Sequence, residues 1–184
     1  MSDADFAYRF DLTAKAINPG ESSGRGVTPA MVRKELEKCF NCTFPIPGAP
    51  DSYPSLYEVL NLQAGFAARV QLIEVDPREP TWTFEALPGH FDGPGSTIRF
   101  FFYDDGTRIH LVIEAKVIRG SKNLPDWYNK LTAQSMWQAF IQQATFNVCA
   151  HQHICSTNLP GDAPIDAPDT AASDTPVGDN RNGG

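Results

Sequence analysis

Alternation of apolar and polar residues dominates the middle of the chain and predicts a group of β-strands. Apolar side chains recur there at every second position, which is the period of a strand with one buried face. Clusters of glycine, proline and aspartate separate the runs, as turns require. We therefore predict four successive strands, at Ala67–Val75, Thr81–Leu87, Ser96–Tyr103 and Thr107–Ile118.

Three other segments have the apolar spacing of helices. Thr28 and Pro29 are typical of an N-cap and a first helical position, and the apolar period continues to Phe40. A short second helix is expected over Ser55–Leu62. The longest helix is expected over Pro125–Val148. Its broad apolar arc indicates that it packs against a large surface, such as the predicted sheet.

The last two strands are expected to form a hairpin around Asp105-Gly106, a dipeptide that two-residue turns prefer. Their opposite face is mixed, and Arg99 lies there diagonal to His110 and Glu114. Exposed ion pairs are weak, so we expect this face to be solvated. A two-residue loop puts six apolar residues on one face by pairing Phe102 with Ile109, Phe100 with Leu111 and Ile98 with Ile113.

Composition divides the chain after Cys155. Residues 156–184 have no aromatic residue and hold five aspartates against one arginine, whereas residues 1–155 hold 17 acidic and 14 basic residues. The last 29 residues therefore carry −4 of the net charge of −7. Such a segment cannot bury enough apolar surface to offset the entropy of ordering. We expect a folded domain over 1–155 and a disordered acidic tail over 156–184.

Charge and hydropathy exclude several classes of partner. An acidic chain without a basic block disfavours nucleic acid. No run of the chain reaches the roughly 18 consecutive apolar residues that a membrane-spanning helix needs. The segment Met1–Asp5 is acidic, unlike the start of a secretory signal, so we expect a cytoplasmic location and reduced thiols.

Several short motifs follow one another in a recognisable order over residues 67–148. They are Phe84-Glu85-Ala86-Leu87-Pro88-Gly89-His90, a link with Gly93 and Gly95, the Asp105-Gly106 turn, and a helix after Pro125-Asp126-Trp127. This order resembles an uncharacterised bacterial family of the START-like, polyketide-cyclase-like (SRPBCC) superfamily. The resemblance implies an α+β helix-grip fold, in which a curved antiparallel sheet packs on a long C-terminal helix around an apolar cavity. It implies an apolar or amphipathic small-molecule ligand, and no shared catalytic residues.

His90 is the best candidate for a general acid or base, if the domain is an enzyme. It follows the Pro88-Gly89 turn at a strand end, and an imidazole titrates near neutral pH. Glu85 or Arg99 would assist it. The alternative is that these side chains only make hydrogen bonds within the turn and on the sheet face, since the spacing specifies no nucleophile or second base.

Two clusters of metal-ligating residues lie outside the predicted sheet. Cys39 and Cys42 form a C-x-x-C pair, which is a standard half-site for zinc. A pair from each cluster would complete four ligands and tie the first helix to the last. A redox role is disfavoured, because the C-x-x-C pair follows a helix C-terminus, where the dipole is unfavourable for a thiolate. The spacing of the second cluster is not typical of zinc sites, so the main expectation is a domain without a cofactor; that cluster is Cys149, His151, His153 and Cys155.

Aromatic residues are numerous, with twelve Phe, five Tyr and three Trp. In a helix-grip fold the same residues form the core or line the cavity, and the sequence does not separate these roles. The candidates for ligand contact alternate on two strands or lie on the long helix, and they are Trp82, Phe84, Phe100, Phe102, Trp137 and Phe140.

Three functions fit these observations. The first is binding of an apolar or amphipathic small molecule in a cavity between sheet and helix, with or without cyclase-like or hydrolase-like chemistry. It predicts an enclosed pocket of about 300–1,000 Å³ with a few polar groups. The second is a protein interaction module, which predicts a filled core and an exposed apolar patch. The third is a zinc-stabilised domain. We favour the first.

Overall fold

The structure, a computed structural model, describes residues 6–15, 24–118 and 125–152. His153, Cys155 and the predicted tail over 156–184 lie outside these residues. Within the described part, no helix is both long enough and apolar enough to cross a membrane. The elements follow in the order β1 (Phe6–Thr13), α1 (Pro29–Lys38), α2 (Phe40–Thr43), β2 (Val59–Gln63), β3 (Ala67–Val75), β4 (Thr81–Ala86), β5 (Thr97–Asp104), β6 (Ile109–Val117) and α3 (Asp126–Gln152).

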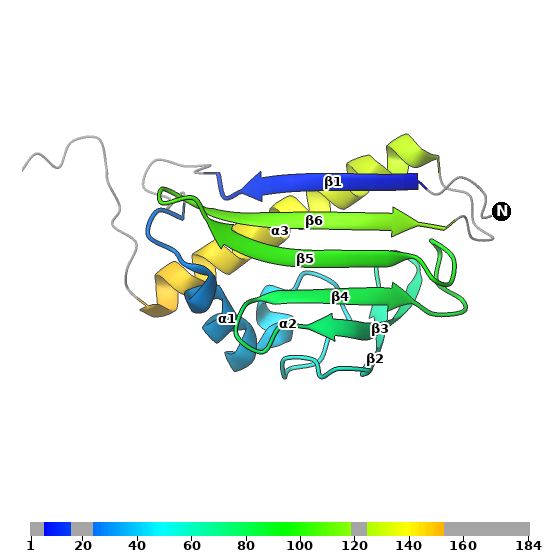
Figure 1. Cartoon of the computed structure of the whole chain (residues 1–184), viewed down its shortest axis with the longest axis horizontal. Coiled ribbons are helices and arrows are strands. Elements are labelled where there is room, and N and C mark those ends of the chain that lie inside the picture. Colours follow the sequence, from blue (N-terminus) through cyan, green and yellow to red (C-terminus); the bar gives the residue numbers. More distant parts are fainter. Residues whose placement is uncertain (1–5, 16–23, 119–124, 153–184) are drawn as a thin grey trace, which may run out of the picture.

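The strands form one antiparallel sheet in the order β1-β6-β5-β4-β3-β2. Helix α3 crosses one face of this sheet diagonally, and α1 and α2 lie at the end of the sheet where α3 finishes (Figure 1). This is the predicted α+β arrangement of a curved antiparallel sheet on a long C-terminal helix. The expected helix-grip fold is therefore confirmed.

The core lies between the inner face of the sheet and α3, and aromatic rings fill much of it. The ring of Trp82 stacks on Phe100 with centroids 5.3 Å apart, and Trp137 of α3 meets Phe100 edge-on at 4.7 Å. Phe44, which follows α2, contacts Phe140 at 5.4 Å. Edge-on and offset contacts of this kind are favourable because of the ring quadrupole, beyond the apolar area that they bury.

Two strands depart from the sequence-based expectations. β1 extends the sheet beyond the four predicted strands, and its alternating residues from Tyr8 to Leu12 enter the core. β2 occupies a segment where a helix over Ser55–Leu62 is expected, and that expectation is wrong. Leu60 and Leu62 stand two positions apart, so an extended chain buries both while its backbone pairs with β3.

The β5–β6 hairpin differs from the predicted register by two residues. Asp104 lies opposite Ile109, so the loop holds residues 105–108 and the predicted two-residue turn is wrong. The carboxylate of Asp105 stabilises this longer loop by accepting hydrogen bonds from the backbone N–H and hydroxyl of Thr107, at 2.8 and 2.7 Å. Because the shift is an even number, every side chain keeps its predicted face.

The outer face of the sheet is mixed, as expected, with charged residues such as Arg99 and Glu114 beside the apolar pair Phe101 and Val112. Arg99 lies directly opposite Glu114 rather than diagonal to it, and their side chains approach to 3.8 Å. Arg99 also approaches Glu74 at 3.9 Å. These side chains are about half exposed, so each ion pair contributes little to stability.

Helix α1 is attached to the end of α3 by a buried carboxylate. Thr28 caps α1 as predicted, and its hydroxyl accepts from the N–H of Met31 at 3.4 Å. The carboxylate of Glu35, buried between the helices, bonds to His151 at 2.7 Å and accepts from the amide of Gln152 at 3.1 Å. These contacts hold the last turn of α3 against α1.

We expect a substitution of Gly48, in the segment between α2 and β2, to lower the stability of the fold. Its φ is +91°, and a Cβ there would collide with the carbonyl oxygen of Asn61 in β2. Gly26 has a similar φ of +80° but open space around it. Gly26→Ala should cost about 1 kcal/mol from the backbone conformation alone. Gly48→Ala should cost more, on the order of 3 kcal/mol, because the backbone of β2 must also move. Urea unfolding of both variants measures this difference, and equal losses would contradict the packing described.

Candidate functional site

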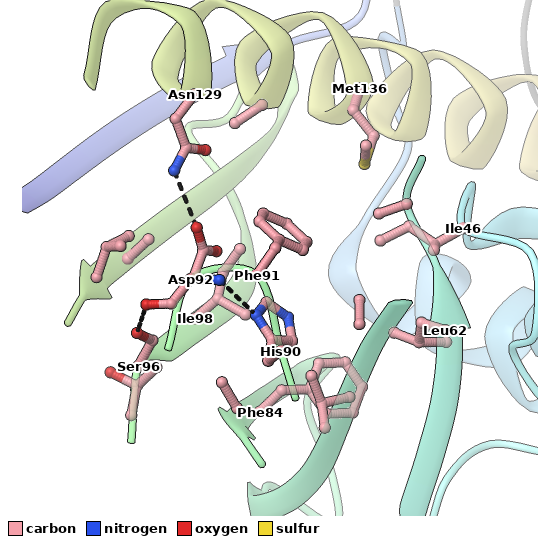
Figure 2. Close-up of a pocket in the computed structure, with 18 of the residues that line it drawn as sticks. Ile46, Leu62, Phe84, His90, Phe91, Asp92, Ser96, Ile98, Asn129 and Met136 are labelled. Carbon is pink, nitrogen blue, oxygen red and sulfur yellow. Dashed lines mark hydrogen bonds between the residues drawn. The ribbon is translucent and has the colours of Figure 1, made fainter. Parts of the chain in front are cut away.

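A cavity of about 240 Å³ lies between the inner face of the sheet and the first half of α3 (Figure 2). This volume is slightly below the range of about 300–1,000 Å³ that is usual for small-molecule sites. Most of its wall is apolar. The sheet, α3 and the segments after α2 and around β2 each supply part of it, including Phe84, Ile98, Met136, Ile46 and Leu62.

The cavity exists because small side chains replace large ones at this end of the core. Ala68, Ala86 and Ala115 face inward from β3, β4 and β6, and Ala133 faces them from α3. All four line the cavity. At the other end of the sheet the inward positions hold large, fully buried rings such as Trp82 and Phe140, which contact one another. The same sheet and helix are therefore packed solid at one end and hollow at the other.

Two aromatic side chains from neighbouring loops border the cavity. Phe66 lies on the β2–β3 turn and Phe91 on the β4–β5 loop, with ring centroids 6.0 Å apart. Phe91 also stacks on the imidazole of His90 at 4.5 Å. Phe66 is 41% exposed, so this part of the wall faces solvent. A guest molecule would meet these rings on the solvent side of the cavity.

The β4–β5 loop places a group of polar side chains at one end of the cavity (Figure 2). The backbone N–H of Asp92 donates to Nδ1 of His90 at 3.0 Å. The Asp92 carboxylate accepts from the amide of Asn129, on α3, at 3.0 Å. The buried hydroxyl of Ser96 donates to the carbonyl oxygen of Asp92 at 2.8 Å and accepts from the N–H of Ile118 at 2.7 Å. These bonds attach the loop to both α3 and the chain after β6.

Burial moves the pKa values of these groups in opposite directions. It lowers the pKa of His90 to about 4, so its imidazole is neutral at physiological pH. Burial raises the pKa of Asp92 to about 6, and the hydrogen bond from Asn129 opposes this rise because it stabilises the charged carboxylate. Burial, and then the nearby Asp92, raise the pKa of Tyr8. A carboxylate in this setting can bind a hydrogen-bond donor and can take up a proton close to neutral pH.

The structure places the other two predicted catalytic residues away from His90. Phe84 and Ile98 line the cavity, and Glu85 and Arg99 follow them directly along β4 and β5. Successive side chains of a strand point to opposite faces, so Glu85 and Arg99 lie on the outer face. Of the three predicted residues, His90 alone lines the cavity.

The predicted ligand-binding aromatics divide into two groups. Phe84, Phe100 and Trp137 line the cavity, whereas Trp82, Phe102 and Phe140 pack in the solid part of the core and do not line it. Sequence reasoning did not identify several polar residues of the wall, among them Tyr8, Asp92 and Asn129. Three features of the sequence could have identified these residues. They are the alternation around Tyr8 in β1, the position of Asp92 close to a strand end, and the helical spacing of Asn129 with Ala133 and Met136.

The cysteines differ from the expected reduced state. Cys39 and Cys42 form a disulfide where the chain turns between α1 and α2, with Cα atoms 5.3 Å apart, a separation that a disulfide spans readily. The expectation of reduced thiols is therefore wrong for this pair, and its sulfurs are not thiolate ligands in this state. His151 bonds to Glu35. No group of three metal-ligating side chains occurs within the described ranges, and the predicted zinc site remains a prediction.

Comparisons with known proteins support the fold. No family model and no curated protein matches the chain. The solved structure of Ara h 8.0201 matches 80% of this chain and 99% of its own at a TM-score of 0.51 and 13% sequence identity. The solved structure of protein MLL2253 from Mesorhizobium loti matches 79% of this chain and 98% of its own, at a TM-score of 0.51 and 16% sequence identity. At these identities the likeness concerns the fold, which is the helix-grip arrangement seen in Bet v 1-like proteins. The comparisons thus support the helix-grip fold that the superfamily resemblance implied. Membership of the uncharacterised bacterial family stays a prediction.

The lowered pKa of His90 predicts how it affects stability as the pH changes. Between its ordinary pKa of 6.5 and about 4, the unfolded chain binds a proton at His90 that the native state does not bind. The native state is therefore favoured above pH 6.5 and loses this advantage as the pH falls toward 4. His90→Gln should remove this part of the acid destabilisation. Urea unfolding at about pH 7.5 and pH 4.5 tests it. An equal stability difference between wild type and variant at both pH values would contradict the buried, neutral imidazole.

Proposed function

We propose that this protein binds an apolar or amphipathic small molecule in the cavity between the sheet and α3. The observation that carries the proposal is the cavity itself, with a wall of apolar side chains and a few polar groups gathered at one end. This combination is typical of small-molecule sites, in which apolar contacts supply affinity and a few polar groups set orientation.

The energetics of packing favour the same conclusion. Protein interiors are normally close-packed, and an empty space costs stability because the surrounding atoms lose contacts. Four inward-facing alanines keep this space open, at Ala68, Ala86, Ala115 and Ala133. Larger side chains at these positions would fill the core. An apolar guest would restore the missing contacts, so the arrangement is suited to a ligand rather than to maximal stability of the protein alone.

The cavity also separates this proposal from the second function considered. A protein interaction module predicts a filled core, whereas this core is hollow at one end. The described surface does expose Leu56, Tyr57 and Val59 around the start of β2. Exposed apolar residues of this kind are common on monomeric proteins, so they weigh less than the cavity.

Native mass spectrometry of the protein as expressed provides a direct test. The proposal predicts an additional mass that remains bound under gentle ionisation and is lost on denaturation. The bound compound should be apolar or amphipathic when extracted. If the protein carries no such mass and also fails to bind an apolar fluorescent dye, the proposal is wrong.

Filling the cavity should weaken binding strongly. Ala133→Phe places a ring in the space between α3 and the sheet, and we expect the affinity for an apolar dye to fall by about tenfold or more. Ala150→Phe is the matched control, because Ala150 is exposed near the end of the same helix. Fluorescence titration measures both variants, and circular dichroism checks that both are folded. A folded Ala133→Phe protein that binds the dye like wild type would place the dye site elsewhere.

A further inference from the structure

The polar end of the cavity has a hydrogen-bonding pattern that specifies its ligand more closely. We propose that it selects a hydroxyl group, so that the ligand is a compact apolar molecule carrying an alcohol or a phenol. This inference deepens the proposed function and rests on it. It depends on one donor and one acceptor that His90 and Asp92 present to the cavity.

His90 supplies the donor. Its Nδ1 accepts the backbone N–H of Asp92 at 3.0 Å, so Nδ1 carries no proton. A neutral imidazole then has its proton on Nε2, which is a donor. The stack with Phe91 holds the ring in place, and the ring lies among the lining side chains (Figure 2). No hydrogen bond to Nε2 occurs within the described residues, so this N–H remains available to a ligand.

Asp92 supplies the acceptor. Its Oδ1 accepts the amide of Asn129 at 3.0 Å, and this bond fixes the carboxylate from the side of α3. Its Oδ2 has no hydrogen-bond partner among the residues that the structure describes. A carboxylate oxygen is an acceptor, so Oδ2 can take a hydrogen bond from a donor on the ligand. The loop that carries both residues is itself fixed by the buried hydroxyl of Ser96.

A hydroxyl group satisfies both requirements, because it donates one hydrogen bond and accepts others. An ammonium group would satisfy Asp92 but would present only donors to the N–H of His90. A carboxylate ligand would bring a second negative charge beside Asp92. Lys116 is the basic residue in the described wall, but it is exposed and stands between the inward-facing Ala115 and Val117, so its side chain points to the outer face.

The size of the cavity suits a ligand of one or two rings, so naphthalene and its derivatives are suitable probes. Naphthalene tests the apolar cavity alone, 2-naphthol adds a hydroxyl, and 2-naphthoate adds a carboxylate. We expect 2-naphthol to bind about tenfold more tightly than naphthalene, and 2-naphthoate to bind most weakly, as measured by calorimetry or fluorescence titration.

Two substitutions separate the donor from the acceptor. His90→Phe keeps a ring stacked on Phe91 and removes the N–H, and Asp92→Leu removes the acceptor. Each should lower the affinity for 2-naphthol by about tenfold and change that for naphthalene by less than about threefold. Glu114→Leu makes a matched change on the outer face and should alter neither affinity.

The outcomes distinguish the two levels of the proposal. If no probe binds the wild-type protein, naphthalene included, the cavity is not a binding site for such molecules and the proposed function fails. If all probes bind but the ratio of 2-naphthol to naphthalene affinity is near one, or is unchanged in both variants, the hydroxyl inference alone is wrong. Tightest binding of 2-naphthoate would overturn it as well. The ratio within one variant is independent of a general loss of stability.

Discussion

The packing of α3 against the inner face of the sheet is the constraint on which the rest of this structure depends. The inner face of the sheet forms the core, and α3 covers most of it, while α1, α2 and the segment after α2 cover the remainder. Where both surfaces carry large side chains, as at Trp82, Phe102 and Phe140, the rings are buried and in contact with one another. Where the same surfaces carry alanine, the helix cannot approach further, because the solid end keeps it at a distance. The cavity is thus a consequence of rigid elements that are matched at one end and not at the other.

The polar end of the cavity depends on how the β4–β5 loop is attached. Ser96 bonds to the loop and to the chain after β6, and Asn129 bonds the loop to α3. The loop is therefore fixed to both layers that enclose the cavity. The same bonds bring His90 and Asp92 into partly apolar surroundings, which lower the pKa of the imidazole and raise that of the carboxyl. The attachment of the β4–β5 loop therefore determines both where His90 and Asp92 lie and how their pKa values are shifted.

The two faces of the sheet serve different purposes. The outer face carries exposed charged residues, among them Arg99 and Glu114, and its ion pairs contribute little energy. Glu85 occupies the same face. The pleat of the strands separates these groups from the cavity completely, although they are neighbours of cavity residues in sequence. Proximity along a strand is therefore a poor guide to a shared site, because adjacent residues point in opposite directions.

The sequence by itself determined the central strands, the long helix, the N-cap at Thr28 and the inner face of the β5–β6 hairpin. Local periodicity and turn chemistry carry that information. The inner face of the hairpin was predicted correctly although the register differed by two residues, because an even shift leaves every side chain on the same face. Tertiary structure decided the features that the periodicity of the sequence does not predict. It made a strand of Val59–Gln63 through pairing with β3, and it joined Cys39 to Cys42. It also selected Phe84, Phe100 and Trp137 for the cavity wall, and it brought Asp92 to Asn129 across 37 positions of sequence. A pattern of apolar residues shows which side of an element is buried, whereas the volume left between two elements depends on side chains that are distant in the sequence.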